Sequence, residues 1–142
     1  MIELRPYQKE LVENIRKSWK KGNKHVLMQM STGAGKTFCF SYICQASVKK
    51  GSNILIITHR EELLSQTSGS LVQFGLTPHL INQKTKNPPK YIRDGNVSVA
   101  MTGTLKNRFK KTEWKNWFEN INLIVLDVFQ VFHWISALPS VF

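Results

Sequence analysis

Seven consecutive residues at positions 31–37 read S-T-G-A-G-K-T, and their types suit the binding of phosphate groups. Because Gly33 and Gly35 have no side chains, backbone N–H groups there can converge on phosphate oxygens. Lys36 can reach the outer phosphates of a nucleoside triphosphate, and the hydroxyl of Thr37 can ligate Mg²⁺. An apolar run precedes the loop and a helix-like stretch follows it, an order that is typical of phosphate-binding loops.

Length and composition limit the class of protein. The chain has 142 residues, of which 42% are hydrophobic and 20% charged, and this predicts one globular domain rather than a disordered chain. The sequence has no apolar run long enough to span a bilayer. Its first residues also lack the charged-then-apolar order of a signal peptide. We therefore expect no membrane partner and a cytoplasmic location.

The chain is strongly basic, with a net charge of +11. Lys and Arg cluster at residues 20–24, 84–93 and 106–115. This balance favours a polyanionic partner, most simply nucleic acid. A solvated surface that maintains solubility is the alternative explanation.

The two cysteines, Cys39 and Cys44, both fall in the helix expected after the loop. Five positions apart, they share a helix face poorly, and no set of Cys and His ligands surrounds them. We expect both to be reduced packing residues without a metal or redox role.

The elements that must position the loop follow from hydrophobic periodicity and from Gly and Pro positions. Helices are expected over residues 6–19, 36–50, 61–74 and 112–120, and strands over 26–30, 53–58, 77–81, 97–102 and 121–127. The alternation of strands and helices predicts an α/β fold, a mostly parallel sheet with helices on both faces.

Composition changes abruptly after residue 127. Residues 128–142 contain no charged side chain, and ten of the fifteen are apolar. Neither helix nor strand periodicity is clean in this segment. The sequence therefore divides into a domain at 1–127 and an atypical uncharged tail at 128–142.

Four further segments carry side chains that could contact a nucleotide or a nucleic acid. Residues 4–8 read L-R-P-Y-Q, and the amide of Gln8 could pair with adenine N6 and N7. Residues 58–66 read T-H-R-E-E-L-L-S-Q, and residues 102–108 read T-G-T-L-K-N-R; each follows an expected strand. Residues 123–127 read L-I-V-L-D, an apolar strand that ends in an acid.

In this order the motifs resemble those of the first RecA-like P-loop domain of superfamily two helicases, over residues 2 to 127. The similarity is greatest to the DEAD/DEAH-type group that includes restriction-enzyme Res subunits and phage helicases. The resemblance implies that the cofactors are ATP and Mg²⁺. It also implies that the nucleotide is bound by Arg5, Gln8, Thr32, Gly33, Ala34, Gly35, Lys36 and Thr37.

The resemblance also implies a nucleic-acid partner, which we expect to be DNA rather than RNA. It assigns contacts with the phosphate backbone to Arg60, Thr102, Thr104 and Arg108. Hydroxyl and N–H donors at strand ends would hold phosphates without reading the base sequence. The alternative is that both segments are ordinary turns with surface side chains.

Asp127 matches the acid that holds Mg²⁺ together with Thr37 in the family. The family has Glu at the next position, where it orients the attacking water, whereas this chain has Val128. Valine cannot accept a proton or hold a water in line, so we assign no catalytic residue and predict severely impaired hydrolysis. A frameshift near codon 128 would explain the tail, and a natural short protein with a Glu-to-Val change is the alternative.

These observations predict the N-terminal motor domain of an ATP-dependent DNA helicase or translocase, incomplete as an isolated chain. The family's second RecA-like domain could come from another polypeptide. The alternative is a non-catalytic ATP- or nucleic-acid-binding module that partners another motor subunit. A small P-loop phosphotransferase is disfavoured because the sequence offers no recognisable phosphoryl-acceptor site.

Overall fold

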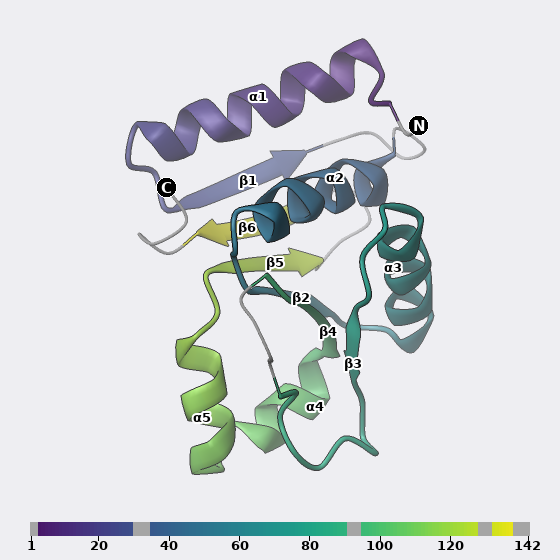
Figure 1. Ribbon diagram of the computed structural model, residues 1–142, viewed down its shortest axis with the longest axis vertical. Helices are drawn as coiled ribbons and strands as arrows, with labels where there is room; N and C mark the ends of the chain where they lie inside the picture. The colour runs from purple at the N-terminus through teal and green to yellow at the C-terminus, as the bar shows by residue number, and fades with distance from the viewer. Residues whose placement is uncertain (1–2, 30–34, 91–94, 128–131, 138–142) are drawn as a thin grey trace.

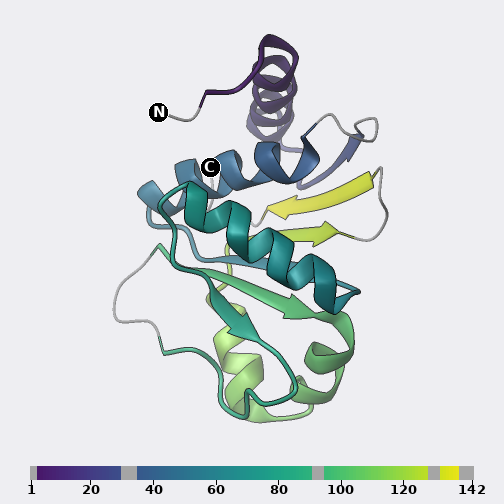
Figure 2. The same ribbon diagram turned by 90° about the vertical axis from the view of Figure 1, so that its right-hand side faces the viewer.

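The computed structural model describes residues 3–29, 35–90, 95–127 and 132–137. One six-stranded sheet runs through the molecule, with helices on both of its faces (Figures 1 and 2). Its strands are β1 (His25–Gln29), β2 (Ile54–Thr58), β3 (His79–Ile81), β4 (Val97–Met101), β5 (Leu123–Asp127) and β6 (Phe132–Ala137).

The strand order is β1-β6-β5-β2-β4-β3, and the pairs among β2, β3, β4 and β5 are parallel. β6 pairs antiparallel with β5 on one side and with β1 on the other. β1 therefore runs in the same direction as β5, and β6 is the strand that opposes the other five. The predicted α/β class with a mostly parallel sheet is confirmed.

The helices are α1 (Pro6–Lys20), α2 (Lys36–Lys49), α3 (Glu61–Gln73), α4 (Thr102–Arg108) and α5 (Thr112–Glu119). Helices α1, α2 and α3 pack on one face of the sheet, where Ile54 and Ile56 join their core cluster. Helices α4 and α5 pack on the other face, where Leu55 joins a second cluster with Trp114 and Trp117. The alternation along β2 follows from the two-residue period of a strand, so this apolar run serves both cores.

A cluster of four asparagines (Asn53, Asn96, Asn120 and Asn122) joins the beginnings of β2, β4 and β5. The Oδ1 atom of Asn53 accepts hydrogen bonds from the backbone N–H groups of Gly95 and Asn96, both at 3.2 Å, and from Asn96 Nδ2 at 3.0 Å. Asn53 Nδ2 donates to the Asn120 carbonyl at 3.1 Å. The Asn53 N–H donates to Asn122 Oδ1 at 2.8 Å. Because these bonds connect three strand starts, the cluster fixes their relative register.

Two elements differ from the sequence-based expectation. Thr102 begins α4 instead of ending β4, and residues 102–108 form a short helix whose Leu105 is buried in the second core cluster. Residues 132–137 form β6, although the tail lacked clean periodicity. Pairing within the sheet stabilises this strand, because the backbones of β1 and β5 form hydrogen bonds with β6 on its two sides.

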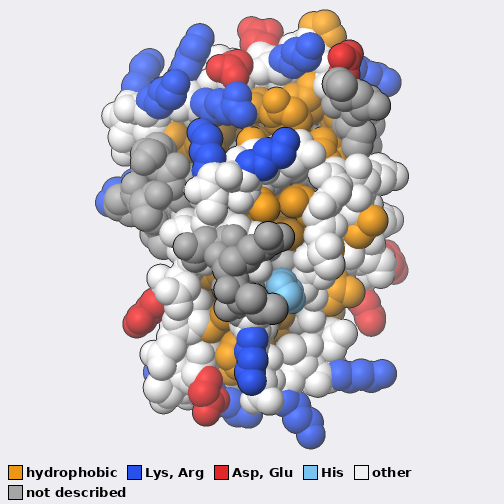
Figure 3. Space-filling view, viewed as in Figure 1, with side chains coloured by type: hydrophobic (Ala, Val, Ile, Leu, Met, Phe, Trp, Pro, Cys, Tyr) orange, Lys and Arg blue, Asp and Glu red, His pale blue; other side chains and the backbone are white. Residues whose placement is uncertain are grey.

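The surface shows Lys and Arg side chains toward both ends of the long axis, with hydrophobic side chains visible between them (Figure 3). The large hydrophobic residues that are exposed among the described ones come from separate elements: Tyr7, Leu27, Val72 and Leu80. Within the described ranges, no helix combines the length and apolar character needed to cross a membrane.

Candidate nucleotide-binding site

The carboxyl ends of the parallel strands meet at one edge of the sheet, where open α/β sheets place ligands. Thr58, the last residue of β2, is aligned with Met101 at the end of β4 and with Asp127 at the end of β5. The segments that follow these strands therefore emerge side by side. β1 runs in the same direction, so the chain also leaves β1 toward this edge before entering α2 (Figure 1).

Gly35 immediately precedes α2 and has a backbone conformation that favours glycine. Its φ is +81°, in the left-handed region, and it occupies the N-cap position of the helix. A Cβ atom built on Gly35 would lie 2.5 Å from the side-chain nitrogen of Gln8. The backbone angle therefore favours glycine here, and the Gln8 amide would have to shift to admit a Cβ. The loop residues Thr32, Gly33 and Ala34 lie outside the described residues.

Gln8 connects the 4–8 segment with the end of the loop. It is buried in the first turn of α1, and its Oε1 accepts a hydrogen bond from the Arg5 backbone N–H at 2.8 Å. Its amide nitrogen is the atom that lies against Gly35. An amide oxygen can accept two hydrogen bonds, so the bond from Arg5 is compatible with the predicted contact to adenine. The side chain of Arg5 is exposed beside it.

Lys36 and Thr37 form the first turn of α2, and both are partly buried. The backbone N–H groups of such a first turn have no partner within the helix and carry its positive dipole end. A positive-φ glycine packed against Gln8, followed by this turn, fits the phosphates of a nucleotide. The residues that the structure describes here are therefore compatible with ATP.

Asp127 ends β5, and its backbone is aligned with Thr58 on one side and with His133 of β6 on the other. β6 lies between the strand that leads to the loop and the strand that ends in Asp127. Val128 lies outside the described residues. In the part of the chain that the structure describes, no group of three or more His, Cys, Asp or Glu side chains is arranged to hold a metal ion.

Two of the residues predicted to contact nucleic acid lie together at this edge. Arg60 is exposed at the N-cap of α3. The hydroxyl of Thr102, also exposed, donates to the Thr58 carbonyl at 3.1 Å, which joins the segment after β4 to the end of β2.

Thr104 and Arg108 are placed differently. Thr104 is buried in α4. The guanidinium of Arg108, at the other end of α4, donates from Nε to the Thr85 carbonyl at 2.8 Å and from Nη2 to the Gln83 carbonyl at 2.9 Å. This contact with the loop after β3 could not be predicted from the sequence, because it joins residues more than twenty positions apart.

The two cysteines are free and buried in α2, as expected for packing residues. Burial raises the pKa of Cys39 to about 11 and that of Cys44 to about 12. Both thiols are therefore protonated at neutral pH, which disfavours nucleophilic or metal-ligand chemistry.

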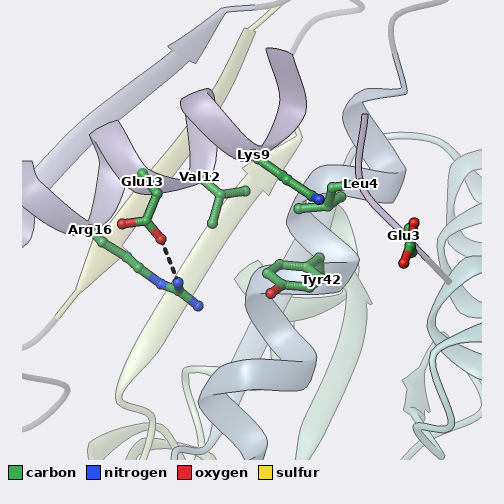
Figure 4. A pocket seen from close by; sticks show the side chains of 7 residues that line it. All are labelled: Glu3, Leu4, Lys9, Val12, Glu13, Arg16 and Tyr42. Carbon is green, nitrogen blue, oxygen red and sulfur yellow. Dashed lines mark hydrogen bonds and ion pairs between the residues drawn. The ribbon is translucent and has the colours of Figure 1, made fainter. Parts of the chain in front are cut away.

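A hollow of about 330 Å³ lies between the beginning of α1 and α2 (Figure 4). It is lined by Glu3, Leu4, Lys9, Val12, Glu13, Arg16 and Tyr42. Arg16 and Glu13 form an ion pair at 2.7 Å on its rim. Among the described residues predicted to contact the nucleotide (Arg5, Gln8, Gly35, Lys36 and Thr37), none lines this hollow.

Comparison with known proteins agrees with the motif order. Residues 1–129 match the family described as type III restriction enzyme, res subunit. The chain is 29% identical over 133 residues to a Saccharomyces cerevisiae protein named "Putative ATP-dependent helicase IRC3". The match covers 87% of this chain and 18% of that protein, so the chain spans less than a fifth of the relative's length.

Proposed function

Because the chain belongs to the type III restriction enzyme res-subunit family, which has the N-terminal domain of superfamily two helicases, we propose that it is the first motor domain of an ATP-dependent DNA helicase or translocase. In this role it binds Mg-ATP and a nucleic-acid backbone at the carboxyl edge of its sheet. The observation that carries the proposal is the packing of Gln8 against Gly35, which joins the proposed adenine and phosphate segments.

In this proposal, the backbone around Gly33 and Gly35 and the first turn of α2 hold the phosphates. Lys36 neutralises the outer phosphates, and Thr37 and Asp127 hold Mg²⁺. Arg5 and Gln8 hold the base, with Gln8 kept in place by the N–H of Arg5. ATP, when bound with Mg²⁺, would supply the phosphoryl-transfer energy that drives a motor.

The nucleic-acid contacts of this proposal lie beside the nucleotide. The exposed Arg60 and the exposed Thr102 would contact phosphates of the strand, which carry no sequence information directly. Binding would therefore be insensitive to base sequence and strongly dependent on salt.

Hydrolysis is a separate part of the proposal. With Val128 in place of Glu, no side chain at that position can orient water, so the chain should bind ATP but turn it over very slowly. Replacing Val128 by Glu should restore a measurable part of the rate if the rest of the site is intact.

Nucleotide binding by the pure chain tests the proposal directly. A fluorescent ATP analogue should bind the wild-type chain and the Val128→Glu variant, and binding should weaken in Lys36→Ala. The matched control is Lys49→Ala, which removes an exposed lysine from the other end of the same helix. Equal binding by the Lys36 and Lys49 variants would remove the functional interpretation of the loop.

Val128 also favours a second function, a non-catalytic module that partners another motor subunit. In that case the Val128→Glu change would restore no hydrolysis in the isolated chain. ATPase would instead appear on mixing with the subunit that supplies the opposing domain.

A further inference from the structure

The loop that follows β3 is held by side chains of α4 and α5. Arg108 of α4 donates two hydrogen bonds to the carbonyls of Thr85 and Gln83, at 2.8 and 2.9 Å. Trp114 of α5 donates from Nε1 to the carbonyl of Lys86 at 3.2 Å. Three donors from two helices thus fix the backbone around Lys84 and Lys86.

The loop is also ordered by its own hydrogen bonds. Asn82 accepts from the backbone of Lys84 through Oδ1 at 2.9 Å and from the backbone of Thr85 through its carbonyl at 3.0 Å. The Asn82 N–H donates to Thr85 Oγ1 at 3.1 Å. These bonds use backbone atoms and leave the side chains of Lys84 and Lys86 exposed.

This end of the molecule holds much of the positive charge. Residues 82–90 and 95–119 contain eight Lys or Arg and two Asp or Glu, a net charge of +6, against +11 for the whole chain. Seven of these lysines are exposed, Lys90 among them. The other six form what we call the basic shelf: Lys84, Lys86, Lys106, Lys110, Lys111 and Lys115. They lie on the loop, on α4 and α5 and between them, at the lower end of the molecule (Figures 1 and 3).

No described carboxylate forms an ion pair with the basic shelf. Among the described residues, the ion pair is Arg16 with Glu13 on α1, and no shelf lysine takes part in one. Glu113 and Glu119 on α5 are the described acids near it in sequence. Unpaired lysines on a fixed backbone leave a local positive potential that favours a polyanion.

The basic shelf is continuous with the proposed nucleic-acid edge through α4. This helix begins at Thr102, at the edge, and ends at Arg108, beside the loop. Seven helical residues span about 10 Å, roughly three phosphate-to-phosphate spacings along one strand of DNA. A strand that crosses Thr102 could therefore reach the shelf without bending away.

We propose that the basic shelf is a second contact surface for nucleic-acid backbone, beyond the strand-end edge, and that Arg108 is a positioning residue that holds Lys84 and Lys86 in place. This inference rests on the nucleic-acid part of the proposed function. It requires no base recognition, because lysines contact phosphates as point charges.

The test compares two triple variants that lose the same charge. Lys84→Gln, Lys86→Gln and Lys110→Gln remove three shelf charges, and Lys20→Gln, Lys21→Gln and Lys24→Gln remove three exposed lysines near the end of α1. Binding of a labelled single-stranded oligonucleotide is measured by fluorescence anisotropy between 50 and 200 mM salt. Thermal unfolding verifies that both variants fold.

The shelf variant should bind on the order of 100-fold more weakly at 0.1 M salt, with a log–log salt slope smaller by about 2, because each lost phosphate contact removes about 0.7 from the slope. The α1 variant should change both quantities much less. Equal losses of affinity in the two variants would show an effect of net charge alone and would overturn the proposal that the shelf is a contact surface. Unchanged binding in the shelf variant would overturn it as well.

The role of Arg108 is tested in the same assay. Arg108→Lys keeps the charge but cannot donate both hydrogen bonds to the loop carbonyls, so affinity for the oligonucleotide should fall in the wild-type background. The same substitution should change this affinity little when Lys84 and Lys86 are already Gln. An equal loss in both backgrounds would contradict a role through the loop.

The experiments distinguish failure of the shelf proposal from failure of the proposed function. If the wild-type chain binds the oligonucleotide and the shelf variant binds equally well, the shelf alone is wrong. If the wild-type chain binds no oligonucleotide at 50 mM salt, the shelf and the nucleic-acid part of the proposal are both wrong. Binding of the ATP analogue, measured on the same samples, reports on the nucleotide part independently.

Discussion

Replacing Asn53 by Ala should destabilise the domain more than any surface change of the same type. The Asn53 side chain makes four hydrogen bonds at the beginnings of β2, β4 and β5, three as acceptor and one as donor. It is 6% exposed, so water can replace these bonds only in part. Each lost bond costs about 1 kcal/mol in net stability.

With partial replacement by water at the half-buried Gly95 and Asn96, the loss should be about 3 kcal/mol. That is a large fraction of the 5 to 15 kcal/mol that holds a typical domain folded. For a domain of this size, it corresponds to a fall in Tm of about 10 °C.

Asn53→Asp separates the contribution of the amide oxygen from that of the amide nitrogen. A carboxylate still accepts from the three N–H groups but has no N–H to donate to the Asn120 carbonyl. The variant should therefore lie between the wild type and Asn53→Ala.

Urea unfolding followed by circular dichroism measures these differences. The matched control is Asn23→Ala, an exposed asparagine with one side-chain bond, from its Nδ2 to Ser18 Oγ at 3.1 Å. The control should lose less than about 0.5 kcal/mol. If Asn53→Ala falls within about 0.5 kcal/mol of this control, the asparagine cluster does not hold the strands as we infer.

Three further outcomes are expected. Gly35→Ala should weaken binding of an ATP analogue at least tenfold, because a Cβ meets Gln8 and a positive φ disfavours alanine; retained affinity would contradict the packing at the loop. Above pH 9, unfolded thiols lose protons that the folded ones keep until about pH 11 and 12, so stability should fall with rising pH. The slope is about 1.4 kcal/mol per pH unit for each cysteine, so Cys44→Ala should halve the cysteine slope between about pH 9 and pH 11, and an unchanged slope would contradict this assignment. Trp114→Phe should cost about 2 kcal/mol in urea unfolding, through the volume lost from a fully buried side chain and the lost bond to the Lys86 carbonyl; a neutral effect would contradict both.

The parallel sheet was predictable because its strands are continuous apolar runs between glycine-terminated helices. Residues 54–58 are buried or nearly so along their length, which only a strand covered on both faces produces. Gly51 and Gly75 follow α2 and α3 with φ of +85° and +77°, as expected for helix ends. The α4 helix was missed because seven residues give too little periodicity.

The candidate site was predictable to the extent that its motifs are contiguous. Gly35, Lys36 and Thr37 follow one another in the sequence, and Gln8 stands in a recognisable segment. The packing of Gln8 on Gly35 and the anchoring of the 83–86 loop by Arg108 and Trp114 join distant positions. Such contacts depend on the tertiary fold, and no local sequence pattern predicts them.

The single reversed strand has a consequence for how the chain acquires its fold. β1 is an edge strand whose neighbour is β6, so His25 pairs with Ser136, more than one hundred positions later. The strand that precedes the phosphate loop is thus made early in synthesis, yet its place in the sheet depends on β6, which connects it to β5. Contacts of such high order are slow to form. We therefore expect docking of β1, and with it completion of the nucleotide edge, to be a late event in folding.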